Sequence, residues 1–508
     1  MPNILNMPDR SEPDHRPTLT LLAACVSTLL VLMNYVQPMT VLPQIAADLH
    51  ADTTGQTWIL NGIALGLASL LLVAGSLADN HGRRRMFLLG TAVSVVGSVV
   101  AATAGTTLVL VLARVVQGGA GAAILVATLG IIGHEFPAGH HRLRATGLWG
   151  GSLGAGIALG PLASAGLAAA ASWRAFFWAY ALASAVLGLL GALALRESRA
   201  AVRRRPDVAA VVTLGAGVAV LLAAVTAGRQ GFGRPLVLVL FAVAVLLLAA
   251  FVAVEARTRE PMLDLGLFTR PAFLLSVGGA LITGFGVIGL MSYLPTAWEH
   301  TLGWTPLVTA CWFALWSGSS FVAATQARRV GLGADHQLAV GLALAGAGSL
   351  LLLGSAGSWS PARHITGLVV AGVGSGLLNS ALARLAIESV PAGQASMGSG
   401  ANNTARYIGS SLGVAATVAV VTTAGGGHGT GHQLGHGAAL GIAHGVDVAL
   451  VAAAALLLVT AAALVLARSG AAPAAPPRTR TADGPAADSR AAGEGAVGDR
   501  STTAVGGQ

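Results

Sequence analysis

The sequence predicts an all-α, polytopic membrane protein with about fourteen transmembrane helices. Hydrophobic residues make up 54% of its 508 residues and charged residues only 10%, and the mean hydropathy is +0.74. A soluble chain of this length usually carries about a quarter charged residues. Between 18 and 468 the chain also holds about fourteen apolar runs near the length that spans a bilayer. Lipid is therefore the expected solvent and the bilayer the expected partner.

The expected spans fall into three groups. Two sets of six flank a pair whose helices hold almost no polar residues, which predicts two six-helix bundles joined by an inserted two-helix hairpin. The spans are 18–38, 56–77, 86–104, 108–130, 145–167, 174–195, 208–228, 235–254, 272–294, 306–326, 337–357, 362–384, 395–423 and 446–467. The expected segments are a cytoplasmic tail (1–17), the first bundle (18–195), links and hairpin (196–271), the second bundle (272–467) and a disordered cytoplasmic tail (468–508).

The arginines predict the orientation. Residues 83–85 and 203–205 are triple-arginine runs in loops on one side, whereas the opposite loops and adjoining span ends hold only Arg174, Arg229, Arg234 and Arg363. Cytoplasmic loops usually carry an excess of arginine. We therefore expect the protein in the cytoplasmic (inner) membrane, with both termini in the cytoplasm. The net charge of +9 is then explained by topology, and no nucleic-acid partner is expected.

The first span contains an unusual polar stretch, "VLMNYVQPMTVLP". Asn34 and Gln37 lie nearly one helical turn apart, and Pro38 weakens the helix beside them. We expect this segment to face a central cavity, with the two amides as substrate-binding groups.

The loop "GSLADNHGRRRMFLLG" joins spans 2 and 3 and is the expected gating loop. Gly75 and Gly82 permit close approach and a tight turn. Asp79 offers a fixed anion to Arg83 and Arg84, or to the N-terminal end of a neighbouring helix.

Span 4 carries Arg114 and Gln117 beside a glycine-rich face, in "LARVVQGGAGAA". A charged side chain within a span is costly and usually faces the bundle interior or water. Alternatively, because few residues precede it in the span, Arg114 extends to the outer interface.

Span 5, "GLWGGSLGAGIALGPLASAG", places Gly147 on one helix face and Gly156 and Gly160 on another. Such faces let another backbone pack closely, and Pro161 bends the span.

Polar groups in the second bundle complete the candidate pathway. Asn402, Asn403 and Arg406 lie within one turn of span 13, where they either face a cavity or form interhelical hydrogen bonds. Tyr293 lies at the end of span 9, Glu299 follows that span, and Asp447 begins span 14.

Several of these motifs resemble those of the major facilitator superfamily. Its loop between spans 2 and 3 is matched by Gly75, Leu77, Ala78, Asp79, Gly82, Arg83 and Arg84, with Asn80 departing from the usual Arg. The span-4 motif R-x-x-Q-G-x-G-A is matched from Arg114, which implies a role in proton coupling or substrate binding. Gly147, Gly156, Gly160 and Pro161 resemble the antiporter motif of the superfamily's exporters, although Ser164 and Ala165 replace its final glycines.

The resemblance extends over about residues 18–468, to the fourteen-span drug:proton antiporters, through "ASWRAFFW", "EPMLDLGLF", "SYLP" and "GSGANNTARYIGSSLGVA". It also draws attention to a missing acid. The family's span-1 pattern places an Asp where this chain has Asn34. Asn cannot titrate, so a proton must be carried elsewhere, and Glu299 and Asp447 are the first candidates.

The sequence therefore predicts a transporter and no enzyme, with no cofactor and no metal. It would act as a monomer and export a small amphipathic organic compound, such as a drug, an antibiotic or a related metabolite, by alternating access and proton antiport. A proton-independent facilitator or importer is the alternative within transport. A metal-dependent membrane enzyme or sensor would instead use the histidine-rich segment that contains His428, His432, His436 and His444, whose glycines favour a flexible loop.

Overall fold

A computed structural model describes residues 17–199, 208–228, 233–258, 261, 263–391, 393–424 and 436–469, and these residues contain helices and no strand. The first half comprises α1 (Pro17–Val36), α2 (Pro38–Asp48), α3 (Thr53–His81), α4 (Arg83–Ala102), α5 (Thr107–Glu135), α6 (His140–Ala170) and α7 (Arg174–Ala194). A hairpin follows, made of α8 (Val208–Gly228) and α9 (Pro235–Arg257).

The second half comprises α10 (Pro271–Ile282), α11 (Leu290–Leu302), α12 (Pro306–Gln326), α13 (Ala334–Leu351), α14 (Pro361–Glu388), α15 (Ala395–Ala424) and α16 (His436–Ser469). The π-helical turn η2 (Thr283–Gly289) joins α10 to α11, and the short 3-10 turns η1 (Leu265–Thr269) and η3 (Ala327–Arg329) precede α10 and follow α12. The chain divides into one compact unit, Met1–Leu466, which contains both halves, and a second, Ala467–Gln508.

The helices confirm the predicted class. Thirteen helices in the described part of the chain are long and apolar enough to cross a membrane. The remaining expected span is α13, whose 18 residues include Asp335, His336 and Gln337 in the first turn and are therefore less apolar. It ends at Leu351 instead of the expected 357, in a turn where Gly354 adopts a positive φ of 74°.

The ninth span is longer than expected. The sequence predicts a span ending at 294, but α10, η2 and α11 form one segment from Pro271 to Leu302. Pro295 lies inside α11 without ending it. Glu299 therefore lies in the last turns of the span and not beyond it.

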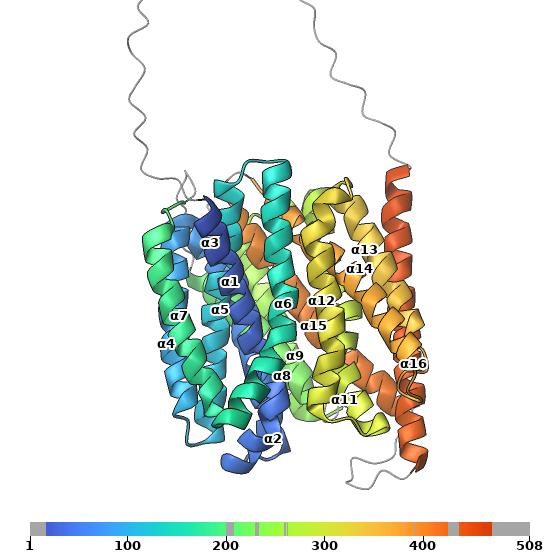
Figure 1. Cartoon of the computed structure of the whole chain (residues 1–508). Coiled ribbons are helices and arrows are strands. Elements are labelled where there is room, and N and C mark those ends of the chain that lie inside the picture. Colours follow the sequence, from blue (N-terminus) through green and yellow to red (C-terminus); the bar gives the residue numbers. More distant parts are fainter. Residues whose placement is uncertain are drawn as a thin grey trace, which may run out of the picture. The chain divides into compact units, whose positions relative to one another are not determined.

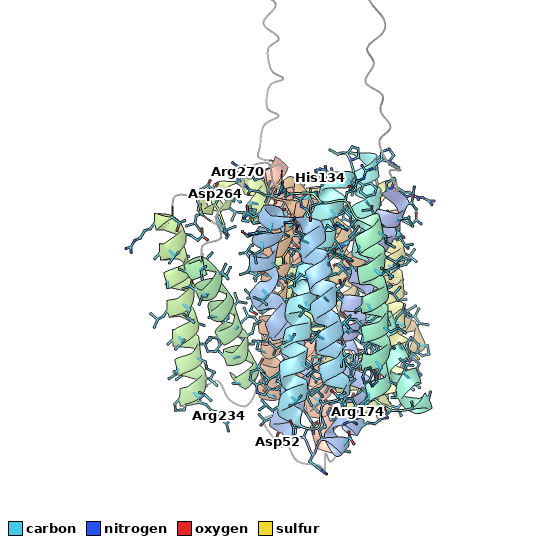
Figure 2. All side chains as sticks on the ribbon, turned by 90° about the vertical axis from the view of Figure 1, so that its left-hand side faces the viewer. Asp52, His134, Arg174, Arg234, Asp264 and Arg270 are labelled. Carbon is cyan, nitrogen blue, oxygen red and sulfur yellow. The ribbon has the colours of Figure 1, made fainter. Side chains whose placement is uncertain are left out.

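The helices share two common ends, which Figure 2 distinguishes by labelled residues. His134, Asp264 and Arg270 lie at one end, and Asp52, Arg174 and Arg234 at the other. We call these the Arg83 end, where α3 meets α4, and the Asp48 end, where α2 stops. In Figure 1, α1 begins at the Arg83 end, at the top, whereas α2 and α11 lie towards the bottom.

The hairpin is peripheral (Figure 2). Its helix α8 packs against α3, while much of α9 exposes leucine and valine side chains such as Leu238 and Leu246. An apolar surface of this kind is suited to lipid.

Helix α6 carries two sets of small residues, one facing the second half and one facing α1 of its own half. Near the Arg83 end, a Cβ on Gly147 would lie 2.8 Å from the carbonyl oxygen of Ala324 in α12. Nearer the Asp48 end, a Cβ on Gly156 would lie 2.4 Å from the carbonyl oxygen of Leu29 in α1, and one on Gly160 would lie 2.6 Å from that of Met33. The first set therefore packs against the second half, and the other set packs against α1.

We predict that Gly160→Val forces α1 and α6 apart, because the new side chain meets backbone that cannot move independently. Overpacking of this kind costs about 1–3 kcal/mol, so the midpoint of thermal unfolding should fall. Gly166→Val is the matched control, because no atom lies within 4 Å of a Cβ at that position of the same helix. Equal midpoints for the two variants would contradict the close contact.

Candidate transport pathway

The two halves are joined at the Arg83 end by a buried polar seam. The Asp79 carboxylate accepts hydrogen bonds from the backbone N–H groups of Ser396 (3.3 Å) and Met397 (2.8 Å), in the first turn of α15. Unpaired N–H groups and the helix dipole make this turn a favourable place for a negative charge. Asp79 of α3 therefore caps a helix of the other half.

Arg83 completes this α3–α15 seam. Its Nη2 lies 2.7 Å from Asp79 Oδ1, and the two side chains are only 2% and 5% exposed. The guanidinium also donates to the carbonyl of Gly393 (2.8 Å) and the hydroxyl of Ser396 (3.2 Å). A buried ion pair is favourable when its remaining groups are hydrogen-bonded, and here the second half provides those partners.

Close backbone approach makes the seam possible. A Cβ on Gly75 would lie 2.5 Å from the carbonyl oxygen of Ser396, so only glycine fits. Gly82 has a φ of 117°, which favours glycine at the α3–α4 turn. Beside it, Arg84 donates to the carbonyl of Ala192 (2.6 Å) and so binds within the first half.

Arg114 is fully buried at the broken end of α1. Because Pro38 has no N–H, the carbonyl of Asn34, four residues earlier, loses its intrahelical donor. Arg114 Nη1 donates to that carbonyl (2.7 Å) and to the Asn34 amide oxygen (3.1 Å), and Nη2 donates to the carbonyl of Tyr35 (3.2 Å). The guanidinium thus faces the bundle interior, and the alternative placement at the outer interface is excluded.

Two amides lie near this cation. Gln117 donates to the hydroxyl of Ser98 (3.0 Å), and its own oxygen lies 3.5 Å from Arg114. Gln37 accepts from Ser164 (3.1 Å), while its buried Nε2 has no hydrogen-bond partner in the structure. Gln37 is therefore the amide with a donor still available for a ligand.

The polar residues of α15 point in different directions. Asn402 donates to the carbonyl and hydroxyl of Ser276 in α10, which is the interhelical alternative. Arg406 donates to Asn403 of its own helix and to Asn379 of α14 (3.3 Å). Thus Asn402 serves helix packing, whereas Asn403 and Arg406 form a buried polar group.

An apolar pocket lies between the halves towards the Asp48 end. Its volume is about 130 Å³, and it is lined by Tyr35, Val36, Met39, Thr40, Ile157, Pro161, Ile288, Met291, Ser292, Pro295, Glu299, Thr309, Ala310, Phe313 and Trp316. Both halves contribute: α1, α2 and α6 form one wall, and η2, α11 and α12 the other. Glu299 is the one carboxylate among these lining residues.

Tyr293 and Asp447, the other two candidates named with Glu299, lie outside this pocket. Tyr293 packs, half-buried, against the core of the second half. Asp447 accepts from the backbone N–H of Gly354 (2.7 Å) and so holds the turn between α13 and α14. Glu299 alone of the three contacts the pocket.

Sequence reasoning missed a cluster of aromatic residues beside the pocket. His364 of α14 is surrounded by Trp298, Trp304, Trp312 and Trp359, with ring centroids 4.7–6.2 Å away. These residues come from separate segments and form no local motif, so only the fold brings them together.

Asp48, outside the spans, is held by the first half. Arg174 and the indole of Trp173 donate to its carboxylate, and the hydrogen bond from Arg174 is the main reason that the pKa of Asp48 is lowered. These contacts tie the end of α2 to α7.

The histidine-rich segment lies mostly outside the described residues. No group of three His, Cys, Asp or Glu side chains in the described residues could hold a metal ion. His428 and His432 lie outside the described residues, and α16 begins at His436.

Comparison with known proteins decides the family. The family model described as "Major Facilitator Superfamily" matches residues 24–414. This chain belongs to the Major Facilitator Superfamily. Members of this family are transporters and not enzymes, so the chain is a multi-pass membrane transporter.

Similar proteins carry names that refer to drug and antibiotic resistance. The multidrug resistance protein Stp of Mycobacterium tuberculosis (strain CDC 1551 / Oshkosh) is 29% identical over 400 residues, which cover 78% of this chain and 74% of Stp. The puromycin resistance protein pur8 of Streptomyces alboniger is 30% identical over 425 residues (81% and 83%). The multidrug efflux pump LfrA of Mycolicibacterium smegmatis is 29% identical over 420 residues (82% and 83%).

A solved structure supports the fold. The human organic anion transporter MFSD10 (TETRAN) superposes with a TM-score of 0.63 and 16% sequence identity, covering 89% of this chain and 100% of that one. This similarity concerns the fold alone.

We predict that Asp79→Asn is strongly destabilising, because it leaves the buried Arg83 without its counter-charge. Removing one member of a buried pair costs about 3–5 kcal/mol, which should appear as a large fall in the thermal unfolding midpoint. Glu388→Gln is the control, since it breaks a similarly spaced but partly exposed pair with Arg384 (2.9 Å) and should cost at most about 1 kcal/mol. Equal losses in the two variants would contradict the structural role of the seam.

Proposed function

We propose that this transporter exports a small amphipathic organic compound by alternating access and that proton antiport drives it. One observation carries the proposal. The pocket lies between the two halves at the Asp48 end, while the α3–α15 seam holds the same halves together at the Arg83 end. A site at the interface of two repeats that rock against each other is the arrangement that alternating access uses.

The arginine distribution supports an orientation for this cycle. Arg83, Arg84 and Arg85 lie at the Arg83 end. Because cytoplasmic loops carry an excess of positive charge, these arginines support a cytoplasmic position for that end and for both termini in a bacterial cell. The pocket then faces outward in a protein of the cytoplasmic membrane. Both walls of the pocket come from one chain, so a monomer is sufficient.

The chemistry of the pocket supports an amphipathic substrate. Met291, Phe313 and Trp316 offer apolar and aromatic contacts, and the hydroxyls of Ser292 and Thr309 are polar lining groups. Glu299 adds a negative charge that would favour a cationic group. The names of Stp, pur8 and LfrA agree with substrates of this general kind.

Proton coupling is assigned to the same carboxylate. Asn34 cannot titrate, and its amide oxygen accepts from Arg114. Glu299 has no ion-pair partner in the structure's described residues and can bind either a proton or a substrate cation. If a proton and a substrate cation compete for the Glu299 carboxylate, the binding of each weakens the binding of the other by the same factor. Such competition is the thermodynamic requirement for antiport.

The first test is export from energised membranes. In everted vesicles, where the cytoplasmic face is outside, the proposal predicts substrate accumulation that a protonophore abolishes. The probe is a fluorescent amphipathic cation such as ethidium. Accumulation unchanged by collapse of the proton gradient would contradict antiport, and uptake in the opposite direction would support an importer.

The second test is Glu299→Gln, which keeps the shape of the side chain but removes its charge and proton. A charge-assisted contact contributes about 1.5–3 kcal/mol, so binding of the cation should weaken about tenfold to a hundredfold. Binding should also lose its pH dependence, whereas Glu388→Gln should retain both. The measurement is equilibrium binding to the purified protein, and unchanged affinity in Glu299→Gln would exclude this role.

A further inference from the structure

We propose that His364 is a second proton-binding site, built from tryptophan rings in place of a counter-ion. We call Trp298, Trp304, Trp312 and Trp359 around His364 the tryptophan box. They are four of the nine tryptophans in the chain and come from α11, the loop before α12, α12 and the loop before α14. The ligand is a proton on Nε2 of the imidazole.

The hydrogen bonds of the imidazole leave one nitrogen able to accept a proton. His364 Nδ1 lies 2.8 Å from the carbonyl oxygen of Ser360. A carbonyl only accepts, so Nδ1 carries the hydrogen in the neutral ring and Nε2 keeps its lone pair. Nε2 is buried and has no hydrogen-bond donor in the structure.

The tryptophan rings supply the negative charge density that an imidazolium needs. Their centroids lie 5.0 Å (Trp298), 5.6 Å (Trp304), 6.2 Å (Trp312) and 4.7 Å (Trp359) from the centroid of His364. Indole faces attract cations within about 6 Å, most strongly where water is excluded. The side chain of His364 is 0% exposed, so the box is such a site.

None of the charged groups around the box acts as the counter-charge for a protonated His364 in place of the rings. Arg363, next in the chain, donates to the carbonyl of Gly354 and opposes a second positive charge. Asp447 of α16 is engaged by Gly354, and the only acid of α11, Glu299, lies in the pocket. His300 of α11 and His444 of α16 are exposed, and α12 contains no charged residue. The N-terminus of α14 also disfavours a cation.

The box lies where a proton from the Asp48 end can reach it and where it can affect the pocket. Trp359 is 45% exposed, so it forms the outer wall. On the inner side, Phe313 contacts Trp298 (centroids 5.6 Å apart) and also lines the pocket. Proton binding at His364 is independent of export, whereas its effect on transport rests on the proton coupling proposed above.

The test is tryptophan fluorescence of the purified full-length protein in lipid nanodiscs, titrated between about pH 4.5 and 8.5, around the ordinary histidine range. Protonated imidazole quenches nearby indoles, so the wild type should show one reversible step. His364→Asn keeps a donor to Ser360 but cannot titrate, and the step should disappear. His444→Asn and Glu299→Gln are controls that should keep it.

A second variant tests the role of the rings without altering the histidine. Trp359→Leu changes a partly exposed side chain, so the protein should fold, and loss of one cation–π contact should lower the proton affinity of His364 about two- to fivefold. The step should move to lower pH. No step in the wild type, a step that survives in His364→Asn, or an unshifted step in Trp359→Leu would each overturn the proposal.

Transport measurements separate this inference from the proposed function. If export is coupled to protons through Glu299 and His364 binds a further one, then His364→Asn should change the dependence of export on the pH at the Asp48 end without abolishing it, because Glu299 still binds a proton. A fluorescence step that disappears in His364→Asn, together with export that ignores the proton gradient, would leave the site in place and refute antiport alone.

Discussion

The arrangement of the two halves depends on one carboxylate that caps a helix of the opposite half. Asp79 of α3 binds the first turn of α15, and Arg83 makes its burial tolerable. The contact is available only because Gly75 lets the backbones of α3 and α15 meet at this point. With the halves joined at the Arg83 end, the pocket at the Asp48 end follows as the place where they diverge.

Helix α6 shows the same principle in its two glycine faces. Gly147 packs against α12 near the joined end, whereas Gly156 and Gly160 pack against α1. The contact with the second half continues as far as Gly154, where a Cβ would lie 3.3 Å from the carbonyl oxygen of Ser317 in α12. Beyond it, Ile157 and Pro161 become pocket wall. A state in which the pocket closes would have to extend the α6–α12 contact towards the Asp48 end, while α1 stays attached to α6.

The break in α1 explains how a buried arginine exists here without an acid. Pro38 frees the carbonyl at the end of α1, and Arg114 takes it. The negative end of a helix dipole and its unpaired carbonyls serve as the counter-charge. The amide oxygen of Asn34 is a further acceptor for the same guanidinium. Arg114 thus has a structural role at the end of α1.

The fold class was predictable from hydropathy, because each span must satisfy its backbone within itself and therefore appears as a continuous apolar run. Boundaries were less predictable: Pro295 fails to end α11, and α13 begins with polar residues that lower its apolar character. The family's local motifs drew attention to Asp79 and to the glycines of α6, which the structure places in close contacts between helices.

Contacts between distant segments could not be predicted in the same way. Asn402 and Asn403 are neighbours in sequence, yet successive helical residues point about 100° apart. Asn402 therefore binds Ser276 of α10, whereas Asn403 binds residues of its own helix. The pocket and the tryptophan box combine residues from helices whose relative placement no local pattern encodes. Glu299 was identifiable as a rare acid, but its position in the pocket required the extended α11.

The central claim is that Asp79 holds the halves together at one end and thereby opens the other. Spin labels at His81 and Val330 would report the separation of the halves at the Arg83 end, and labels at Gln44 and His300 that at the Asp48 end. All four side chains are exposed, and Cys25 and Cys311 would be replaced by Ser. The direct measurement is the set of inter-label distances, by pulsed electron paramagnetic resonance, with and without Asp79→Asn. The account predicts that this substitution lengthens the first distance and shortens the second, and it is contradicted if both distances are unchanged or if both lengthen.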